Sequence, residues 1–163
     1  MDPTPQRRSA IPGWFGAVVV ILVAVFLCAG AVPVMGIVAA IAIPNFVSMQ
    51  LKAKRAEVPA TVDAIKVAEL AHHAAFDTWV AAGSERDARS RVGKQKQLPP
   101  RDPGWEKLGW APADPQYGAY WVVVTGDGFE VHGVSDVDGD GVLAEYVATQ
   151  DRNATLVSEG WAY

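Results

Sequence analysis

One uninterrupted apolar run constrains what this chain can fold into more than any other feature. Residues 13–49 contain no charged side chain, whereas 20% of the 163 residues in the whole chain are charged. About 18 or more apolar residues in a row are typical of a transmembrane helix. As a helix, the whole run would reach roughly 55 Å, well beyond a hydrocarbon core of about 30 Å. It therefore predicts either two membrane spans, or one span continued by an apolar helix outside the bilayer.

The middle of the run favours a single span. A two-span hairpin needs a polar turn, and residues 28–33 offer only a weak and uncharged one. The run is also too long for the apolar region of a cleaved signal peptide. We therefore expect one span at about 14–34 within an apolar helix that covers 13–49. Pro44 and Pro59 are expected to kink the helix, because proline removes a backbone hydrogen bond.

The residues that precede the run form a separate segment. Residues 1–12 are mostly polar and contain three prolines, at positions 3, 5 and 12, which predicts a disordered tail. Arg7 and Arg8 favour a cytoplasmic position for this tail, because basic residues are enriched on the cytoplasmic side of a membrane. The basic residues at 52, 54 and 55 favour the opposite orientation.

The next segment, 50–82, is predicted to be an amphipathic helix that ends before Gly83. Its apolar residues recur at helical spacing, with Lys66, Glu69 and Asp77 on the opposite side. The predicted buried face comprises Ala56, Ala60, Ile65, Val67, Ala68, Leu70, Ala71, Ala75 and Val80.

After a basic and proline-rich loop at 83–116, the residue pattern changes from helical to strand spacing. The final segment, 117–163, holds β-rich or alternating stretches separated by Gly-Asp turns. The predicted strands are 120–124, 129–134, 142–147 and 153–157. A sheet of three or four short antiparallel strands needs a cover on one face, and the amphipathic helix supplies one. The sequence therefore predicts an α+β fold, in which a long membrane-anchoring N-terminal helix packs on a small antiparallel sheet.

Charge is distributed unevenly along the chain. The net charge of −4 argues against a nucleic-acid partner. Residues 86–101 hold six basic residues and one acid, whereas residues 127–163 hold eight acids and one base. The two regions are either two solvated faces or complementary surfaces that steer the association of neighbouring copies.

Residues 36–46, Gly-Ile-Val-Ala-Ala-Ile-Ala-Ile-Pro-Asn-Phe, resemble the N-terminal helix of type IV pilins and type II secretion pseudopilins. The similarity continues through 52–57, and residues 108–120 look like the start of the pilin sheet. Residues 135–143 resemble an acidic, glycine-containing turn found in many pilins. The resemblance implies a pilin-like fold and an assembly helix. On this helix the matching residues are Gly36, Ala39, Ala40, Ile43, Pro44 and Phe46.

The chain departs from the family at the start of the helix. When Pro44 is aligned with the family's helix proline, Leu22 stands where prepilins have the glycine before the cleavage site. Leu27 stands where they have a glutamate, and no acidic residue occurs between Asp2 and Glu57. That glutamate is a costly charge in lipid, retained because it helps subunits to dock. The departure predicts a relative that keeps the fold without ordinary processing.

The turn that contains Asp136, Asp138 and Asp140 is a candidate calcium site. Alternating carboxylates followed by Gly141 match the first half of an EF-hand-type loop, and calcium takes six to eight oxygen ligands. Glu145 is the nearest acid that could complete the set, although it lies before the position of the closing EF-hand glutamate. The alternative is a solvated Asp-Gly turn without an ion.

Other polar residues give no catalytic pattern. His72 and His73 are adjacent on the predicted helix and point about 100° apart, so we expect one packed and one exposed ring rather than a metal site. His132 and Glu130 share one face of a strand because of its alternation. We therefore expect a protein that is not an enzyme.

Two functions follow as expectations. Through the resemblance, the chain would be a structural or assembly protein of a type IV pilus or type II secretion system. Its partners would be the membrane and other pilin-like subunits or secretion-apparatus proteins. It would be a single-pass protein of the bacterial inner membrane with its C-terminal domain outside the cytoplasm. The alternative is a single-pass membrane protein with an extracytoplasmic calcium-binding module.

Overall fold

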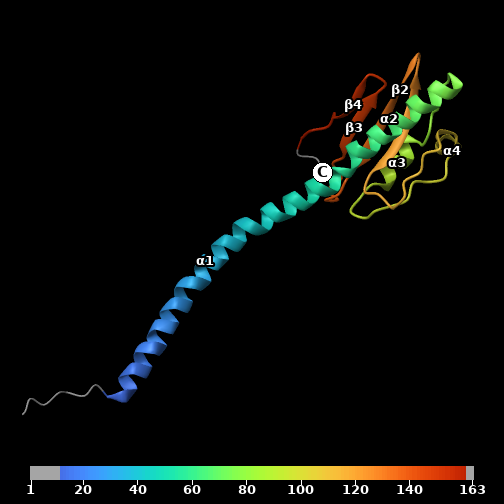
Figure 1. Cartoon of the computed structure of the whole chain (residues 1–163). Coiled ribbons are helices and arrows are strands. Elements are labelled where there is room, and N and C mark those ends of the chain that lie inside the picture. The colour runs from blue at the N-terminus through green and yellow to red at the C-terminus, as the bar shows by residue number, and fades with distance from the viewer. Residues whose placement is uncertain (1–11, 161–163) are drawn as a thin grey trace, which may run out of the picture. The chain divides into compact units, whose positions relative to one another are not determined.

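The computed structural model describes residues 12–160 and divides the chain into two compact units, residues 1–46 and 47–163. The disordered tail predicted at 1–12 lies almost wholly outside the described residues. Helix α1, Gly13–Arg55, contributes all of the described helix in the first unit and continues into the second (Figure 1). The apolar helix predicted at 13–49 is therefore present as one element.

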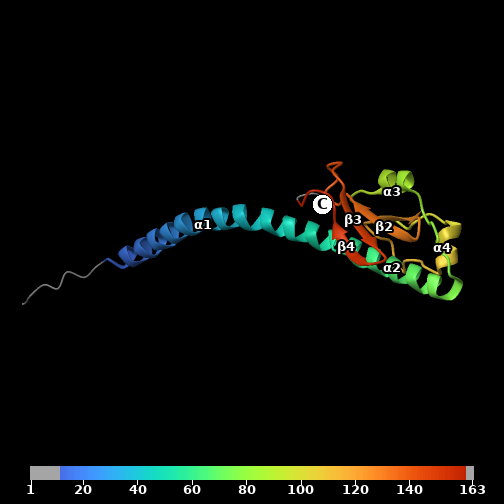
Figure 2. The ribbon, with the colours of Figure 1, turned by 90° about the horizontal axis from the view of Figure 1, so that it is seen from above.

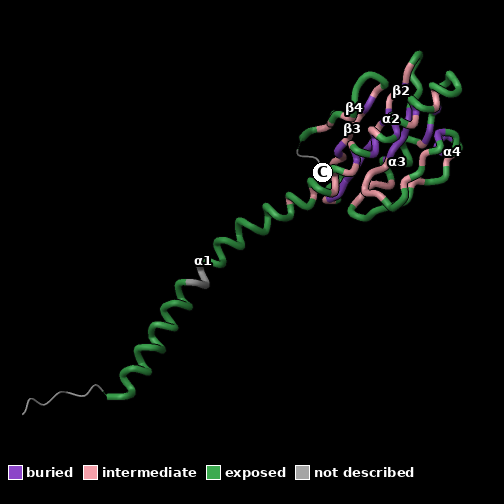
Figure 3. Tube along the Cα trace, viewed as in Figure 1, coloured by how far each residue is buried: buried purple, intermediate pink, exposed green. Residues whose placement is uncertain are grey.

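Helix α1 is long enough and apolar enough to cross a membrane. Residues 13–30 and 34–47 of this helix are all exposed, as the tube coloured by burial shows (Figure 3). Phe26 is 80% exposed and Met35 is 72% exposed. Pro44 lies inside the helix and does not end it. The residues of the first unit whose burial is described therefore form no core, and their surface is suited to lipid or to another apolar helix.

Helix α2, Glu57–Phe76, follows α1 after a single turn residue, Ala56. Pro59 accounts for this break, because it has no N–H to donate to the carbonyl of Arg55, four residues earlier. The helix ends six residues before the predicted boundary at 82. Asp77 adopts left-handed backbone angles, with φ 56°, and its N–H donates to the carbonyl of His73. Such a residue is a common way to end a helix.

Four antiparallel strands form a sheet in the order β1-β2-β3-β4, which confirms the predicted α+β fold. The strands are β1 Ala119–Thr125, β2 Gly128–Ser135, β3 Ala144–Thr149 and β4 Arg152–Leu156. Tyr120 is paired with Gly133, and His132 with both Trp121 and Val147. Strand β3 begins two residues later than predicted, because the N–H of Val142 is used within the preceding turn by the side chain of Asp140.

The sheet is covered on both faces. Helix α2 lies along one face, and helix α3, Glu85–Arg91, lies on the other (Figure 2). The α2 face holds the main core, which is formed by Val58, Val62, Ile65, Val80, Ala82, Trp105, Leu108, Tyr120, Val122, Phe129, Val131 and Ala148. The α3 face holds a smaller cluster of Ala88, Trp121 and Val134. The sequence predicted the first cover but not the second.

The segment predicted as a loop at 83–116 contains two short helices, α3 and α4, Pro103–Leu108. Helix α4 begins where the side chain of Asp102 accepts a hydrogen bond from the N–H of Gly104, with proline at the first helical position. It ends at Gly109, with φ 62°. The capping residues were visible in the sequence, but six residues are too few to show a helical period.

Candidate functional site

The predicted assembly residues all lie on α1. The residues are Gly36, Ala39, Ala40, Ile43, Pro44 and Phe46, and all of them are exposed. Ile43 is 62% exposed and Phe46 is 61% exposed. This stretch holds no charged residue. It can therefore be buried against lipid or an apolar partner without leaving a charge unpaired.

Helix α2 turns its polar residues toward its own domain. Glu69 is fully buried, and Lys66 is only 8% exposed. The Nζ of Lys66 donates to the side chain of Asn153, and a carboxylate oxygen of Glu69 accepts from the N–H of Val80. The Asp63 carboxylate accepts from the N–H of Ala154. These hydrogen bonds hold strand β4 and the connecting segment 77–82 against helix α2.

The outer face of α2 is consequently apolar. Its exposed residues are Ala60, Ala64, Val67, Leu70, Ala71, Ala74, Ala75 and Phe76. Val67 is 63% exposed, and Phe76 is 67% exposed. The predicted buried face was therefore wrong for six residues, which are exposed: Ala56, Ala60, Val67, Leu70, Ala71 and Ala75. The predicted exposed side was wrong for Lys66 and Glu69, which are buried. A surface helix usually keeps its charges in water, and here each charge finds a buried or half-buried hydrogen-bond partner instead.

Four alanines and one valine in this set give the outer face of α2 a particular shape. Ala60, Ala64, Val67, Ala71 and Ala74 alternate at spacings of four and three residues. This spacing places them in one row along the helix, as in the seam of two packed helices. Small side chains in such a row allow a second helix to approach closely.

The acidic turn between β2 and β3 brings together three of the four predicted calcium ligands. One carboxylate oxygen from each of Asp136, Asp138 and Asp140 lies within 4.8 Å of the others. Asp136 accepts from the N–H of Gly139 at 2.7 Å and from that of Gly141 at 3.3 Å, so the turn itself holds its carboxylate in place. Burial, followed by the neighbouring charge of Asp140, raises the pKa of Asp138. A bound cation would relieve the mutual repulsion of these carboxylates.

Glu145 lies outside this group of aspartates. One of its carboxylate oxygens contacts Nδ1 of His132 at 3.2 Å, and the other accepts from Arg89 at 2.8 Å. Its N–H donates to the hydroxyl of Ser158. Strand pairing explains the difference, because Glu145 is opposite Val134 in the sheet and points to the α3 face.

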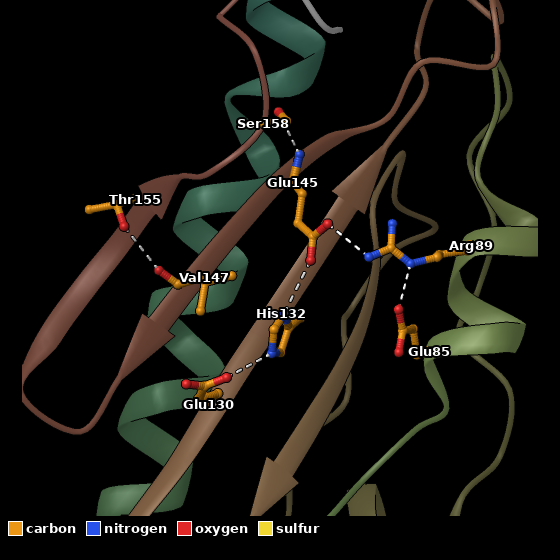
Figure 4. Close-up of polar contacts among 8 residues, drawn as sticks. All are labelled: Glu85, Arg89, Glu130, His132, Glu145, Val147, Thr155 and Ser158. Carbon is orange, nitrogen blue, oxygen red and sulfur yellow. Dashed lines mark hydrogen bonds and ion pairs between the residues drawn. The ribbon is translucent and has the colours of Figure 1, made fainter. Parts of the chain in front are cut away.

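Glu145 instead belongs to a charged network on the α3 face of the sheet (Figure 4). His132 contacts Glu130 through Nε2 at 3.3 Å, and its ring stacks on Trp121 with centroids 4.7 Å apart. Because both ring nitrogens face carboxylates, only the doubly protonated ring donates to both. Arg89 joins α3 to the network and also contacts Glu85 at 2.8 Å. The hydrogen bond to Glu145 raises the pKa of Arg89.

The basic segment and the acidic C-terminal third meet within the same chain. Besides the Arg89 contact with Glu145, the aliphatic part of Lys94 lies against Gly139 in the acidic turn. The interpretation as two separately solvated faces is therefore incomplete, and part of the charge complementarity is intramolecular. The sequence shows the two charge blocks, but only the register of α3 on the sheet shows which residues pair.

Comparisons with known proteins identify no similar protein. A scan against protein families, a search of curated proteins and a search of solved structures each found no match. The class is defined by the fold alone. An apolar N-terminal helix, followed by a helix packed on a four-stranded antiparallel meander, is a pilin-like architecture.

Proposed function

We propose that this chain is a membrane-anchored, pilin-like assembly protein that works through helix contacts with other subunits. The single observation that carries the proposal is the apolar outer face of α2, Glu57–Phe76, which follows an apolar α1. A bilayer covers only about 20 helical residues. The exposed apolar positions of the helical run from Gly13 to Phe76 extend far beyond that length.

The remaining apolar surface favours a helical protein partner over lipid. Helices that lie on a membrane surface carry large apolar residues flanked by lysine and arginine. The outer face of α2 is mostly alanine and has no exposed charge within the helix. Together with the resemblance at 36–46, this supports a role in a type IV pilus or type II secretion apparatus of the bacterial inner membrane. The domain at 47–163 would then lie outside the cytoplasm.

The test introduces a charge into the outer face of α2. Ala71→Glu changes an exposed position, so the domain is expected to fold normally, whereas a buried uncompensated charge would disrupt a helix contact. Ile43→Asn tests the same idea on α1. The matched control is Ala113→Glu, which makes the same change at an exposed loop position.

The readout is the size of cross-linked complexes in native membranes, with thermal unfolding of the domain measured in parallel. We expect Ala71→Glu and Ile43→Asn to lose the complexes while the melting temperature stays within about 2 °C of the unsubstituted protein. Complexes that survive both substitutions would contradict the proposal.

The alternative function, an extracytoplasmic calcium-binding module, is favoured by the convergence of three aspartates. One carboxylate oxygen of Asp138 is buried and has no hydrogen-bond partner in the described part of the chain. Asp136, Asp138 and Asp140 would supply the protein oxygens, with Glu145 engaged elsewhere. Calcium would neutralise the mutual repulsion of the carboxylates.

Calcium binding predicts a gain in stability that depends on concentration. At calcium 100-fold above Kd, the domain should be stabilised by about 2.7 kcal/mol relative to the protein in chelator. Asp138→Asn should remove the gain, whereas Asp127→Asn, an acid in another turn, should preserve it. A melting temperature that does not respond to calcium would exclude this function.

A further inference from the structure

We infer that residues 77–82, the segment that follows α2, form a strap that is closed over Glu69 while this carboxyl is neutral and opens when it is charged. The strap contains no helix, and its one contact with the sheet ladder is the bridge residue Ala82. Local opening of such a segment costs less free energy than unfolding of the domain. The inference depends neither on the proposed helix contacts nor on the calcium site.

The side chain of Glu69 is fully buried, and only one of its two carboxylate oxygens has a partner. Oε2 accepts from the N–H of Val80, in the strap, at 3.2 Å. Oε1 is buried and has no hydrogen-bond partner in the described part of the chain. A buried polar atom without a partner is rare in native proteins, and water would satisfy this one if the strap opened.

Glu57, on the same helix, shows the contrasting case of a carboxylate with both oxygens engaged. One oxygen accepts from the N–H of Tyr117 at 2.7 Å, and the other contacts Nζ of Lys96 at 3.2 Å. Glu69 likewise accepts from a backbone N–H of a distant segment, but it forms no ion pair with any residue between positions 12 and 160. A negative charge is therefore compensated on Glu57 and uncompensated on Glu69.

The surroundings of Glu69 oppose its ionisation. Burial raises its pKa above the ordinary 4.5, and the Val80 N–H and the nearby His72 offset only part of this effect. On α2 and on the elements packed against it, β2, β3, β4 and α4, His72 is the one described titratable or charged side chain that affects this pKa. The other buried charged residues that the structure describes are Lys66, which is bound to β4, and Asp136, in the acidic turn. Ionisation of Glu69 therefore places an uncompensated charge in the core, which hydration through an open strap relieves.

Opening of the strap has a consequence for the sheet. Ala82 exchanges two backbone hydrogen bonds with Val122 of β1, at 2.7 and 3.3 Å. Strand β1 is at one end of the strand order, so the strap covers its outer edge at this point. When the strap opens, the N–H and carbonyl of Val122 become free on that edge, where another strand can pair.

The experiment measures amide hydrogen exchange of the full chain in detergent micelles by NMR, from about pH 5 to pH 8, corrected for the intrinsic pH dependence of exchange. We expect the protection of Val80, Ala82 and Val122 to fall about tenfold as the pH rises, which is the effect of leaving one buried polar atom without a partner. The amide of Ile65, inside α2, should keep its protection. The Glu69 carboxyl, followed by carbon NMR in the same samples, should titrate with the same midpoint.

Four variants assign the effect to its residue. Glu69→Gln removes the charge and should keep the strap closed at every pH. Glu57→Gln is the matched control, because it removes a carboxylate that also accepts a backbone N–H, and it should leave the pH dependence unchanged. His72→Gln should retain the fall in protection and move its midpoint upward, because His72 lowers the pKa of Glu69. His73→Gln, which removes a ring stacked on the strap, should also retain the fall.

Several outcomes would overturn the inference. One is protection of Val80, Ala82 and Val122 that does not change with pH. Another is the same fall in Glu69→Gln, which would assign the pH dependence to a different group. An equal fall at Ile65 would show that the whole domain opens rather than the strap. A Glu69 carboxyl that titrates with a different midpoint from the amide protection would overturn the inference without any variant.

Discussion

Helices α2 and α3 cover opposite faces of one sheet, and they are held there by different forces. Helix α2 buries Val58, Val62 and Ile65 completely against the strands. Helix α3 buries one alanine, Ala88, and is otherwise joined to the sheet through Arg89. Salt does not weaken apolar burial, whereas it screens half-exposed ion pairs. The comparison indicates that the α2 face supplies the stability of the domain and that α3 is a weaker, adjustable cover.

The largest expected effect tests the α2 side of this comparison. Ile65→Ala removes a fully buried side chain and should destabilise the domain by about 3 kcal/mol. Val67→Ala, two residues away on the exposed face, should change stability by less than about 0.5 kcal/mol. Chemical denaturation of the solubilised chain measures both. Similar losses at the two positions would mean that the α2 face is assigned incorrectly.

The closeness of α2 to the sheet predicts the next effect. Gly133 lies beneath the helix, and a Cβ atom there would be 2.5 Å from Cγ2 of Val62. Gly133→Ala should therefore destabilise the domain by about 2 kcal/mol through overpacking. Gly93→Ala, where a Cβ atom meets no neighbour within 4 Å, is the control. The combination Gly133→Ala with Val62→Ala should recover part of the loss, and an additive loss would argue against direct contact.

Glu69 predicts a pH dependence on the α2 side. Burial raises the pKa of this carboxyl, against the smaller opposing effects of the Val80 hydrogen bond and His72. Because the folded pKa is above the unfolded one, the stabilising contribution is complete below about pH 4.3 and is lost as pH rises through the folded pKa. Glu69→Gln should therefore stabilise the domain by about 1 kcal/mol at pH 7.

The control for this prediction is the same comparison of the two proteins at low pH. The advantage of Glu69→Gln over the unsubstituted protein should vanish at about pH 4, where Glu69 is protonated in both states. Melting temperatures at pH 4, 5.5 and 7 provide the comparison. If Glu69→Gln instead melts below the unsubstituted protein by the same amount at all three pH values, the charge of Glu69 is compensated in the folded state.

The smallest expected effect tests the α3 side. Arg89→Ala removes the contacts with Glu145 and Glu85 but should cost less than about 1 kcal/mol, because the Arg89 side chain is 37% exposed. The loss should shrink further in 1 M salt. Arg86→Ala, an exposed residue on the same helix, is the control. A loss as large as that of Ile65→Ala, or one independent of salt, would remove the distinction between the two helices.

Much of the fold was predictable because it follows from local pattern. The apolar run at 13–49, the strand alternation between 120 and 157 and the Gly-Asp turns predict a long helix and a four-stranded meander, and the structure confirms both. The faces of α2 were not predictable from the same pattern. Lys66 and Glu69 look solvent-exposed by type, and the partners that allow their burial, Asn153 and Val80, are distant in sequence.

The candidate sites divide in the same way. Asp136, Asp138 and Asp140 converge because they lie in one short turn, so their spacing alone predicted the cluster. Glu145 lies only five residues further on, yet its strand directs it toward His132 and Arg89 instead. A pocket beside α4 is built from residues 99–112, a segment rich in prolines and charges that also holds two tryptophans, and nothing in its spacing predicts a pocket.

The sequence by itself determined that this protein has an apolar membrane-length helix, a small antiparallel sheet and a tight acidic turn. Each of these depends on residues that are neighbours in the chain, where spacing translates directly into geometry. Only the tertiary structure decided which side of α2 faces the domain, which acids pair with which bases and that rings gather into a pocket. Those features depend on contacts between distant segments, and a single sequence specifies such contacts only through the complete packing of the chain.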